Sequence, residues 1–186
     1  LLGVQLDTID IEPAMNTYSG MLETLAGGKP IDRGTMAENI QSRSRAIILM
    51  SMSNALGSMV LTTGNKSEIS VGYATLYGDM CGGYSVLKDV YKTDVFRLAR
   101  WRNQMTSNVL NGPPGSIIPE RVITKAPSAE LRAEQTDQDT LPPYEMLDDI
   151  LSCLVEGAMG LNEITERGHS PELIMRVWQM LDAAEY

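Results

Sequence analysis

The stretch LTTGNKSEISVGYATLYGDM, residues 61–80, decides how this sequence is interpreted. The apolar run SMVLTT, residues 58–63, precedes its polar part and predicts a short buried strand that ends at Thr63. Gly64 and four polar residues follow, and then comes a second glycine-rich turn with an acid, YGDMCGG, residues 77–83. Glycine and polar residues between two ordered elements are typical of an ordinary loop. The alternative is a site for an anionic ligand.

The residues before this stretch predict one strand and two helices. Apolar residues alternate over residues 3–11, which favours a strand. Pro13 opens a helix that Gly27 and Gly28 end. The sequence TMAE, residues 35–38, is a capping box for a long helix that Gly57 stops.

The residues after the stretch predict mainly helices. Residues 87–103 have helical spacing, residues 106–119 are irregular, and residues 121–132 are extended chain and turn. Two further helices begin after Pro142-Pro143 and at Ser170-Pro171. Their expected buried residues are Leu147, Ile150, Leu151, Leu154 and Val155 in the first, and Ile174, Val177, Trp178 and Leu181 in the second.

Strands separated by helices predict an α/β fold with a parallel sheet flanked by helices, followed by a helical C-terminal part. Ligands of open α/β sheets bind at the carboxyl ends of the strands. The loop after Thr63 lies at such an end. This position favours the ligand-site interpretation of residues 64–68.

Composition limits the function classes. The chain has 186 residues, enough for one domain, and a net charge of −9, which argues against non-specific nucleic-acid or anionic-membrane binding. No apolar run approaches the roughly 18 residues of a membrane span. Cys81 and Cys153 form no motif, which favours the reducing cytoplasm. With a single histidine, a His/Cys metal cluster is excluded, whereas a hard cation held by carboxylates stays possible.

Several polar residues are candidates for chemistry. Thr63 offers a hydroxyl at the strand end, and Glu68 could bind Mg²⁺ or a ligand hydroxyl. A structural alternative for Glu68 is an acid in the first turn of a helix. Lys125 and Ser128, in KAPS, form either a donor-rich turn or an ordinary surface turn.

Two pairs at helical spacing are further candidates. Lys88 and Lys92 are four residues apart and could hold a phosphate between them, although a solvated helix face is the alternative. Asn39 and Arg43 share a face of the long helix, where the guanidinium could bind a phosphate or carboxylate or pair with a nearby glutamate, Glu38 or Glu68. His169, before a predicted helix cap, is expected at the surface.

Four segments together resemble the synthetase domain of the glutamine-dependent NAD⁺ synthetase family. They are AENIQSR (37–43), LTTGNKSEISVGYATLYGDMCGGYSVLKDVYKTDVFRLARWRN (61–103), PERVITKAPSAELR (119–132) and DQDTLPPYEMLDDIL (137–151). The resemblance covers nearly the whole chain and implies an adenine nucleotide α-hydrolase-like fold. It also implies that residues 1–186 are one such domain, incomplete at both ends.

The resemblance implies a cytoplasmic ligase that uses ATP and Mg²⁺. ATP would adenylate the carboxylate of nicotinic acid adenine dinucleotide, and ammonia would then displace AMP to give NAD⁺. The ammonia would come from glutamine through a glutaminase domain, and the protein would be a homodimer or a larger homo-oligomer. No nucleic acid or membrane partner is implied.

The resemblance also assigns roles residue by residue. Thr63, Lys92 and Ser128 correspond to residues that contact ATP. Asn39, Arg43, Glu68 and Tyr73 correspond to residues that contact the deamido dinucleotide. Glu68 is in addition the expected catalytic and Mg²⁺-binding carboxylate.

The sequence departs from the family pattern at both ends. The Ser-Gly-Gly-x-Asp-Ser phosphate loop would lie before Leu1, and a basic substrate-binding segment would follow Tyr186. We therefore expect residues 1–186 alone to be inactive. The rival interpretations are another ATP-pyrophosphatase, such as the synthetase domain of GMP synthetase, and a non-catalytic regulatory or dimerising remnant. The segments GNKSE and KAPSAEL argue against the first rival.

Overall fold

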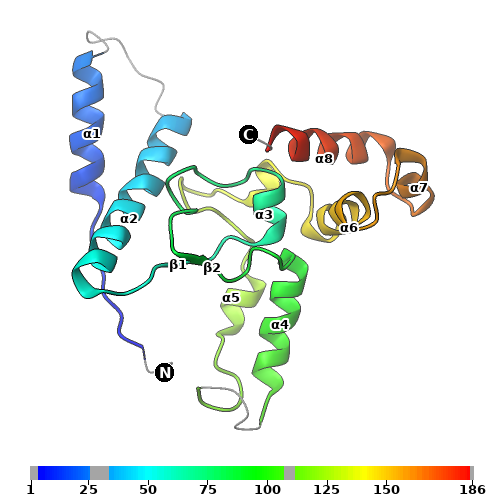
Figure 1. Cartoon of the computed structure of the whole chain (residues 1–186), viewed down its shortest axis with the longest axis horizontal. Helices are drawn as coiled ribbons and strands as arrows, with labels where there is room; N and C mark the ends of the chain where they lie inside the picture. Colours follow the sequence, from blue (N-terminus) through cyan, green and yellow to red (C-terminus); the bar gives the residue numbers. More distant parts are fainter. Residues whose placement is uncertain (1–3, 26–33, 107–111, 185–186) are drawn as a thin grey trace.

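The computed structural model describes residues 4–25, 34–106 and 112–184. It contains two long N-terminal helices, a short two-stranded sheet with helices beside it, and a C-terminal group of three helices (Figure 1). In chain order the elements are α1 (Glu12–Leu25), α2 (Gly34–Leu56), β1 (Leu61–Thr62), α3 (Lys66–Ser70), β2 (Tyr84–Ser85), α4 (Lys92–Gln104), α5 (Glu120–Thr124), the 3-10 helix η1 (Asp137–Asp139), α6 (Tyr144–Val155), α7 (Leu161–Glu166) and α8 (Pro171–Ala183).

The sheet is parallel, as predicted, but short. Leu61 of β1 is paired with Tyr84 of β2, and Thr62 with Ser85. Gly82 permits this pairing because a Cβ atom there would lie 2.6 Å from the Thr62 Cγ2 atom and 3.0 Å from the Val60 carbonyl oxygen. The α/β class with a parallel sheet and a helical C-terminal part is therefore confirmed.

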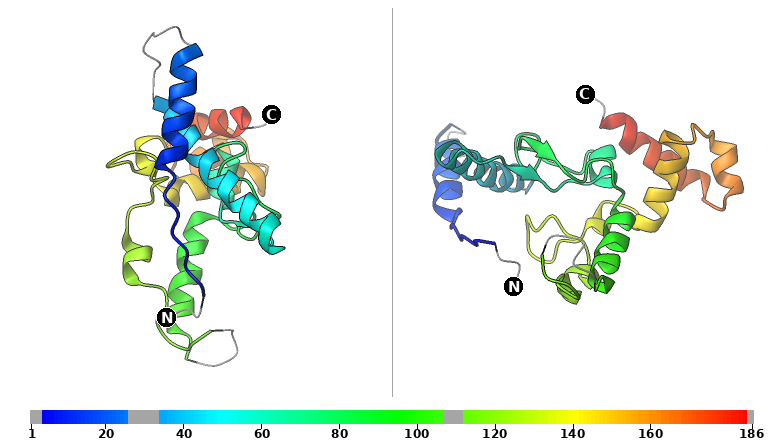
Figure 2. Two further views of the ribbon diagram at one scale, coloured as in Figure 1. Left: turned by 90° about the vertical axis from the view of Figure 1, so that its left-hand side faces the viewer. Right: turned by 60° about the horizontal axis from the view of Figure 1, so that its bottom comes forward.

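The hydrophobic core lies in the C-terminal part. Helices α6 and α8 pack together, and α7 joins them (Figures 1 and 2). The side chains with no measurable exposure there are Leu147, Ile150, Leu151, Ile164, Ile174 and Val177. Because α3 and α4 also pack on α6, this core supports the loop after β1.

Several predicted boundaries are confirmed. Helix α1 ends at Leu25, and its predicted stop at Gly27-Gly28 lies outside the described residues. Helix α2 ends before Gly57, whose φ of +63° favours glycine. The Ser170 hydroxyl accepts the Leu173 amide at the start of α8, with Pro171 in its first turn. Helix α2, however, begins at Gly34, so Thr35 lies inside it and is not its N-cap.

Other predictions are wrong. Residues 4–11 form no strand, and most of them are exposed. The predicted strand at 58–63 shortens to β1, and α4 begins at Lys92 instead of residue 87. The segment predicted as extended contains α5. Two residues expected in the core are about half exposed: Val155 and Trp178.

Candidate functional site

The loop after β1 is a strand-to-helix turn that a capping box closes. The Asn65 side-chain oxygen accepts the Glu68 amide at 3.1 Å, and Glu68 Oε2 accepts the Asn65 amide at 3.2 Å. Asn65, the N-cap of α3, is only 3% exposed. Glu68 is therefore an acid in the first helical turn, as the structural alternative predicted.

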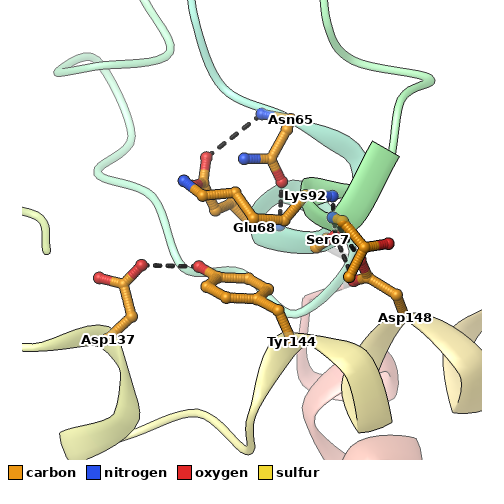
Figure 3. A network of polar contacts seen from close by, with 8 residues as sticks. Asn65, Ser67, Glu68, Lys92, Asp137, Tyr144 and Asp148 are labelled. Atoms are coloured by element: carbon orange, nitrogen blue, oxygen red, sulfur yellow. Dashed lines mark hydrogen bonds and ion pairs between the residues drawn. The ribbon is translucent and has the colours of Figure 1, made fainter. Parts of the chain in front are cut away.

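Glu68 has a second role, because its other carboxylate oxygen is paired with Lys92. The Lys92 Nζ atom lies 2.8 Å from Glu68 Oε1, and about a fifth of each side chain is exposed. Because the pair is partly buried, salt screens it less than it screens a pair at the surface. The contact joins α3 to the first residue of α4 (Figure 3).

Two buried side chains hold the start of α4 beside α3 (Figure 3). The Ser67 hydroxyl accepts the Lys92 amide at 2.8 Å and donates to Asp148 Oδ1. Asp148 Oδ2 accepts the Thr93 amide at 2.9 Å. Two of the orphan amides at the start of α4 are thus satisfied from α3 and α6, which fixes the position of the Lys92 backbone.

The Lys92 ammonium also lies beside two aromatic rings. It is 5.4 Å from the centre of the Tyr144 ring and 5.9 Å from that of Phe96. Tyr144 in turn donates its hydroxyl to Asp137 Oδ2 at 2.7 Å (Figure 3). Burial first, and then the hydrogen bond and charge of Asp137, raise the pKa of Tyr144 far above its ordinary value.

A cavity of about 600 Å³ opens beside Lys92. It brings together two of the three residues predicted to contact ATP, Lys92 and Ser128, and adds the cationic side chains of Arg121 and Lys125. Thr63, the third, is exposed directly after β1 and is not among the residues that line this cavity. Lys125 is paired with Glu130 across the turn. The Glu130 amide donates to the Ser128 hydroxyl.

A second cavity, of about 300 Å³, lies between α2 and the segment after α3. It contains two of the residues predicted to contact the dinucleotide, Asn39 and Tyr73. The Asn39 side-chain oxygen accepts the Thr75 hydroxyl at 3.1 Å. Burial first, and then the charge of Asp137, raise the pKa of Tyr73 to about 12, so this phenol is neutral at physiological pH.

Of the two predicted pairs, Asn39 and Arg43 share helix α2 as predicted, but Lys88 and Lys92 do not share a helix. Arg43 is exposed, lies outside the lining of the smaller cavity, and donates from Nε to the Leu76 carbonyl at 3.1 Å. Lys88 precedes α4, so it does not share a helix face with Lys92. The prediction that Lys88 and Lys92 hold a phosphate between them on one helix face is therefore wrong.

The histidine is also less exposed than predicted. His169 Nε2 lies 2.6 Å from Asp149 Oδ2, and the histidine side chain is 14% exposed. Arg167 contacts the other oxygen of Asp149 at 3.0 Å. The hydrogen bond from His169, together with Arg167, holds the pKa of Asp149 below its ordinary value. This cluster joins α6 to the α7–α8 turn and lines neither cavity.

Sequence reasoning placed Asn65 and Ser67 within the candidate loop, residues 64–68, but gave neither a role of its own, and it missed Asp137 and Asp148. The role of Asn65 could have been found, because Asn followed three residues later by Glu is a capping signal. The role of Ser67 could not, since Ser67 and Asp148 meet across 81 positions. Among the described residues, no group of three or more His, Cys, Asp or Glu side chains could hold a metal ion.

A family model described as NAD synthase matches residues 1–186, the whole chain. The chain belongs to the NAD synthase family. The glutamine-dependent NAD⁺ synthetase of Rhodobacter capsulatus is 50% identical over 185 residues, which are 100% of this chain and 33% of that protein. The one of Thermotoga maritima is 44% identical over 185 residues, with 100% and 31% covered. The chain thus spans about a third of the length of these NAD synthase relatives.

Solved structures give the same family and fold. Glutamine-dependent NAD⁺ synthetase from Acinetobacter baumannii, in complex with ADP, is 42% identical with a TM-score of 0.53, over 92% of this chain and 28% of that one. NMN synthetase from Francisella tularensis is 22% identical with a TM-score of 0.74, over 98% and 63%, and shows the fold alone. None of the described helices is long and apolar enough to cross a membrane.

Proposed function

We propose that this chain is the synthetase part of an enzyme that amidates nicotinic acid adenine dinucleotide to NAD⁺ at the expense of ATP. Family membership supports the reaction class, and one structural relationship supports the site. Lys92, in the larger cavity, is paired with Glu68, whose carbonyl accepts the Tyr73 amide at 2.8 Å. Tyr73 lines the smaller cavity. The Glu68–Lys92 ion pair thus connects a residue of the larger cavity to a residue of the smaller one.

Each cavity has the chemistry of one substrate. In the larger one, Lys92 and Ser128 bind ATP phosphates, with Arg121 and Lys125 as further cations. In the smaller one, Asn39 and Tyr73 contact the deamido dinucleotide. Thr63 and Arg43 are both exposed. In the intact protein Thr63 completes the ATP contacts, and Arg43 completes the contacts to the dinucleotide.

The carboxylate of the deamido dinucleotide attacks the α-phosphorus of ATP and releases pyrophosphate. Ammonia then attacks the acyl carbon and AMP leaves with one of the former carboxylate oxygens. Lys92 stabilises negative charge that develops on the phosphates, and Glu68 orients the lysine and the dinucleotide. Fixed cationic groups of this kind lower the barrier because they need little reorganisation during the reaction.

Magnesium fits this site only in part. Glu68 supplies one carboxylate, and each of its oxygens already accepts one hydrogen bond. Mg²⁺ commonly takes one or two carboxylates and completes its shell with phosphate oxygens and water. Glu68 would therefore be one ligand of a Mg²⁺ ion that arrives with ATP and neutralises phosphate charge.

The relatives are named glutamine-dependent and are about three times as long as this chain. We therefore place the ammonia source in a glutaminase domain, in a cytoplasmic homo-oligomer of at least two copies. The test is an assay of the intact protein with ATP, Mg²⁺, the deamido dinucleotide and either ammonia or glutamine. We expect NAD⁺, AMP and pyrophosphate in equal amounts. ATP binding without product would support a non-catalytic remnant instead.

A further inference from the structure

Asp137 is a buried carboxylate that the proposed reaction does not use. It is 2% exposed, and its Oδ2 atom accepts the Tyr144 hydroxyl at 2.7 Å. Its Oδ1 atom is buried and has no hydrogen-bond partner among the described residues. A buried carboxylate is costly unless its oxygens are bonded, so an incompletely bonded one calls for an explanation.

The Tyr144 hydrogen bond fixes the ring that lies beside Lys92. Tyr144 is 4% exposed, and its ring centre is 5.4 Å from the Lys92 Nζ atom. An ammonium beside an aromatic ring is attracted by the ring's negative face. Since the hydroxyl is anchored on Asp137, the ring cannot turn freely, and the ammonium has a defined neighbour on the side away from Glu68 (Figure 3).

Tyr73 carries a second buried polar atom of this kind. Its hydroxyl has no hydrogen-bond partner among the described residues. Burial first, and then the charge of Asp137, raise the pKa of Tyr73 to about 12. Tyr73 offers a donor and Asp137 an acceptor, and Tyr73 lines the smaller cavity.

We infer that Asp137 is a positioning residue that acts on Lys92 through Tyr144. One carboxylate oxygen anchors the tyrosine whose ring flanks the Lys92 ammonium. The inference rests on the proposed function insofar as Lys92 binds ATP. It adds two residues, Asp137 and Tyr144, that line neither cavity but determine where the Lys92 ammonium lies.

The chain contains a matched control for this arrangement. The Tyr91 hydroxyl donates to Glu156 Oε2 at 2.7 Å, and Lys66 lies 4.9 Å from the centre of the Tyr91 ring. This tyrosine, carboxylate and lysine repeat the same chemistry, yet none of them lines either cavity. Tyr91→Phe therefore removes a tyrosine–carboxylate hydrogen bond of the same length, 2.7 Å, that involves no atom of Lys92.

The first test uses ATP affinity in the intact protein. Tyr144→Phe should weaken ATP binding about three- to tenfold, as expected for loss of roughly one hydrogen bond that orients a cation. Binding of the deamido dinucleotide should change less than about twofold, and Tyr91→Phe should change neither. Asp137→Asn should retain more ATP affinity than Asp137→Ala, because an amide oxygen still accepts the tyrosine hydroxyl.

The second test is a double-mutant cycle with Lys92→Ala. If Tyr144 acts through Lys92, Tyr144→Phe should have no further effect on ATP affinity in the Lys92→Ala background. An undiminished effect there, or equal effects of Tyr144→Phe and Tyr91→Phe, would overturn the inference. A protein that binds ATP normally but makes no NAD⁺ would refute the proposed function, while the ATP titrations would still decide on Asp137. If Asp137→Ala does not fold, the ATP affinity of Tyr144→Phe by itself decides whether the inference holds.

Discussion

The Lys92 ammonium and the Glu68 carboxylate form an ion pair, with Nζ 2.8 Å from Oε1, where α3 meets the start of α4. Each partner is also held by its backbone, since the Lys92 amide donates to Ser67 and the Glu68 amide donates to Asn65. The pair is therefore fixed before any ligand arrives. Preorganised charges of this kind are suited to stabilising a developing negative charge.

Removing the Glu68 charge should slow the reaction more than it destabilises the protein. We expect Glu68→Gln in the intact protein to lower turnover at least about tenfold, or roughly 1.4 kcal/mol of barrier. The free energy of unfolding should fall by only about 1 kcal/mol, because glutamine can still complete the capping box. Steady-state NAD⁺ formation and urea unfolding measure the two effects.

Glu156→Gln is the control for that change. Glu156 accepts hydrogen bonds from Lys66 and Tyr91, but it lines neither cavity. Its substitution should lower stability by a similar amount and leave turnover unchanged. Normal turnover in Glu68→Gln would reduce Glu68 to a helix-capping residue.

Alanine substitutions of Lys92 and Lys88 should have very different effects on the KM for ATP, although the two lysines are only four residues apart. Lys92→Ala should raise the KM for ATP at least about tenfold, and Lys92→Arg should rescue it poorly because guanidinium and ammonium differ in shape and hydration. Lys88 is exposed and precedes α4, so Lys88→Ala should be indistinguishable from the native protein. The KM for ATP, measured at saturating deamido dinucleotide, compares them. Equal effects of the two alanine substitutions would contradict this.

Asp148 should matter for stability. It is 5% exposed and accepts both the Ser67 hydroxyl and the Thr93 amide. Asp148→Ala leaves both donors buried without a partner, so the free energy of unfolding should fall by about 2–4 kcal/mol. Glu145→Ala, at an exposed site on the same helix, should cost at most about 1 kcal/mol. Urea unfolding checks both, and similar losses would argue against a capping role for Asp148.

Gly82 is expected to tolerate no side chain. A Cβ atom there would approach Thr62 Cγ2 to 2.6 Å and the Val60 carbonyl to 3.0 Å, which would force β1 and β2 apart. Gly82→Ala should therefore lower the free energy of unfolding by about 1–3 kcal/mol. The control is Gly64→Ala, where the added atom would meet only Ile69, at an ordinary 3.7 Å. Comparable melting temperatures for the two variants would refute this packing.

The Asp149–His169 contact should make the free energy of unfolding depend on pH in the acidic range. The pKa of Asp149 is held below its ordinary value of 3.8, so ionised Asp149 favours the folded state. That contribution is present above about pH 4 and is lost as pH falls through the lowered pKa of the folded state. The difference in unfolding free energy between the native protein and Asp149→Asn should therefore shrink below pH 4. A difference that does not change with pH would contradict the contact.

Local signals in the sequence predicted several elements correctly. Gly57 ends α2 and Ser170 caps α8, because both act on their immediate neighbours. Residues 4–11 alternate like a strand, yet a strand also needs a partner, and none is paired with them among the described residues. The start of α4 depends on Asp148, which is 55 positions from Thr93, so helical spacing alone placed it too early.

The candidate site was predictable to a similar extent. Lys92 and Ser128 line one cavity, and Asn39 and Tyr73 line the other, while the substrate contacts that the family resemblance assigns to them stay predictions. The resemblance could not show that Glu68 and Lys92 pair, because no local spacing relates residues in two helices. Asp137 and Tyr144, seven residues apart, bond across the start of α6, and only the packed structure shows which side chain lies beside them.

The most direct test of the proposed function follows an oxygen atom. The intact protein is given ATP, Mg²⁺, ammonia and deamido dinucleotide labelled with ¹⁸O in its nicotinate carboxylate, and the products are analysed by mass spectrometry. Because an acyl-adenylate loses AMP with one carboxylate oxygen, we predict one ¹⁸O atom in each AMP formed. Unlabelled AMP, or ADP together with labelled inorganic phosphate, would contradict the account.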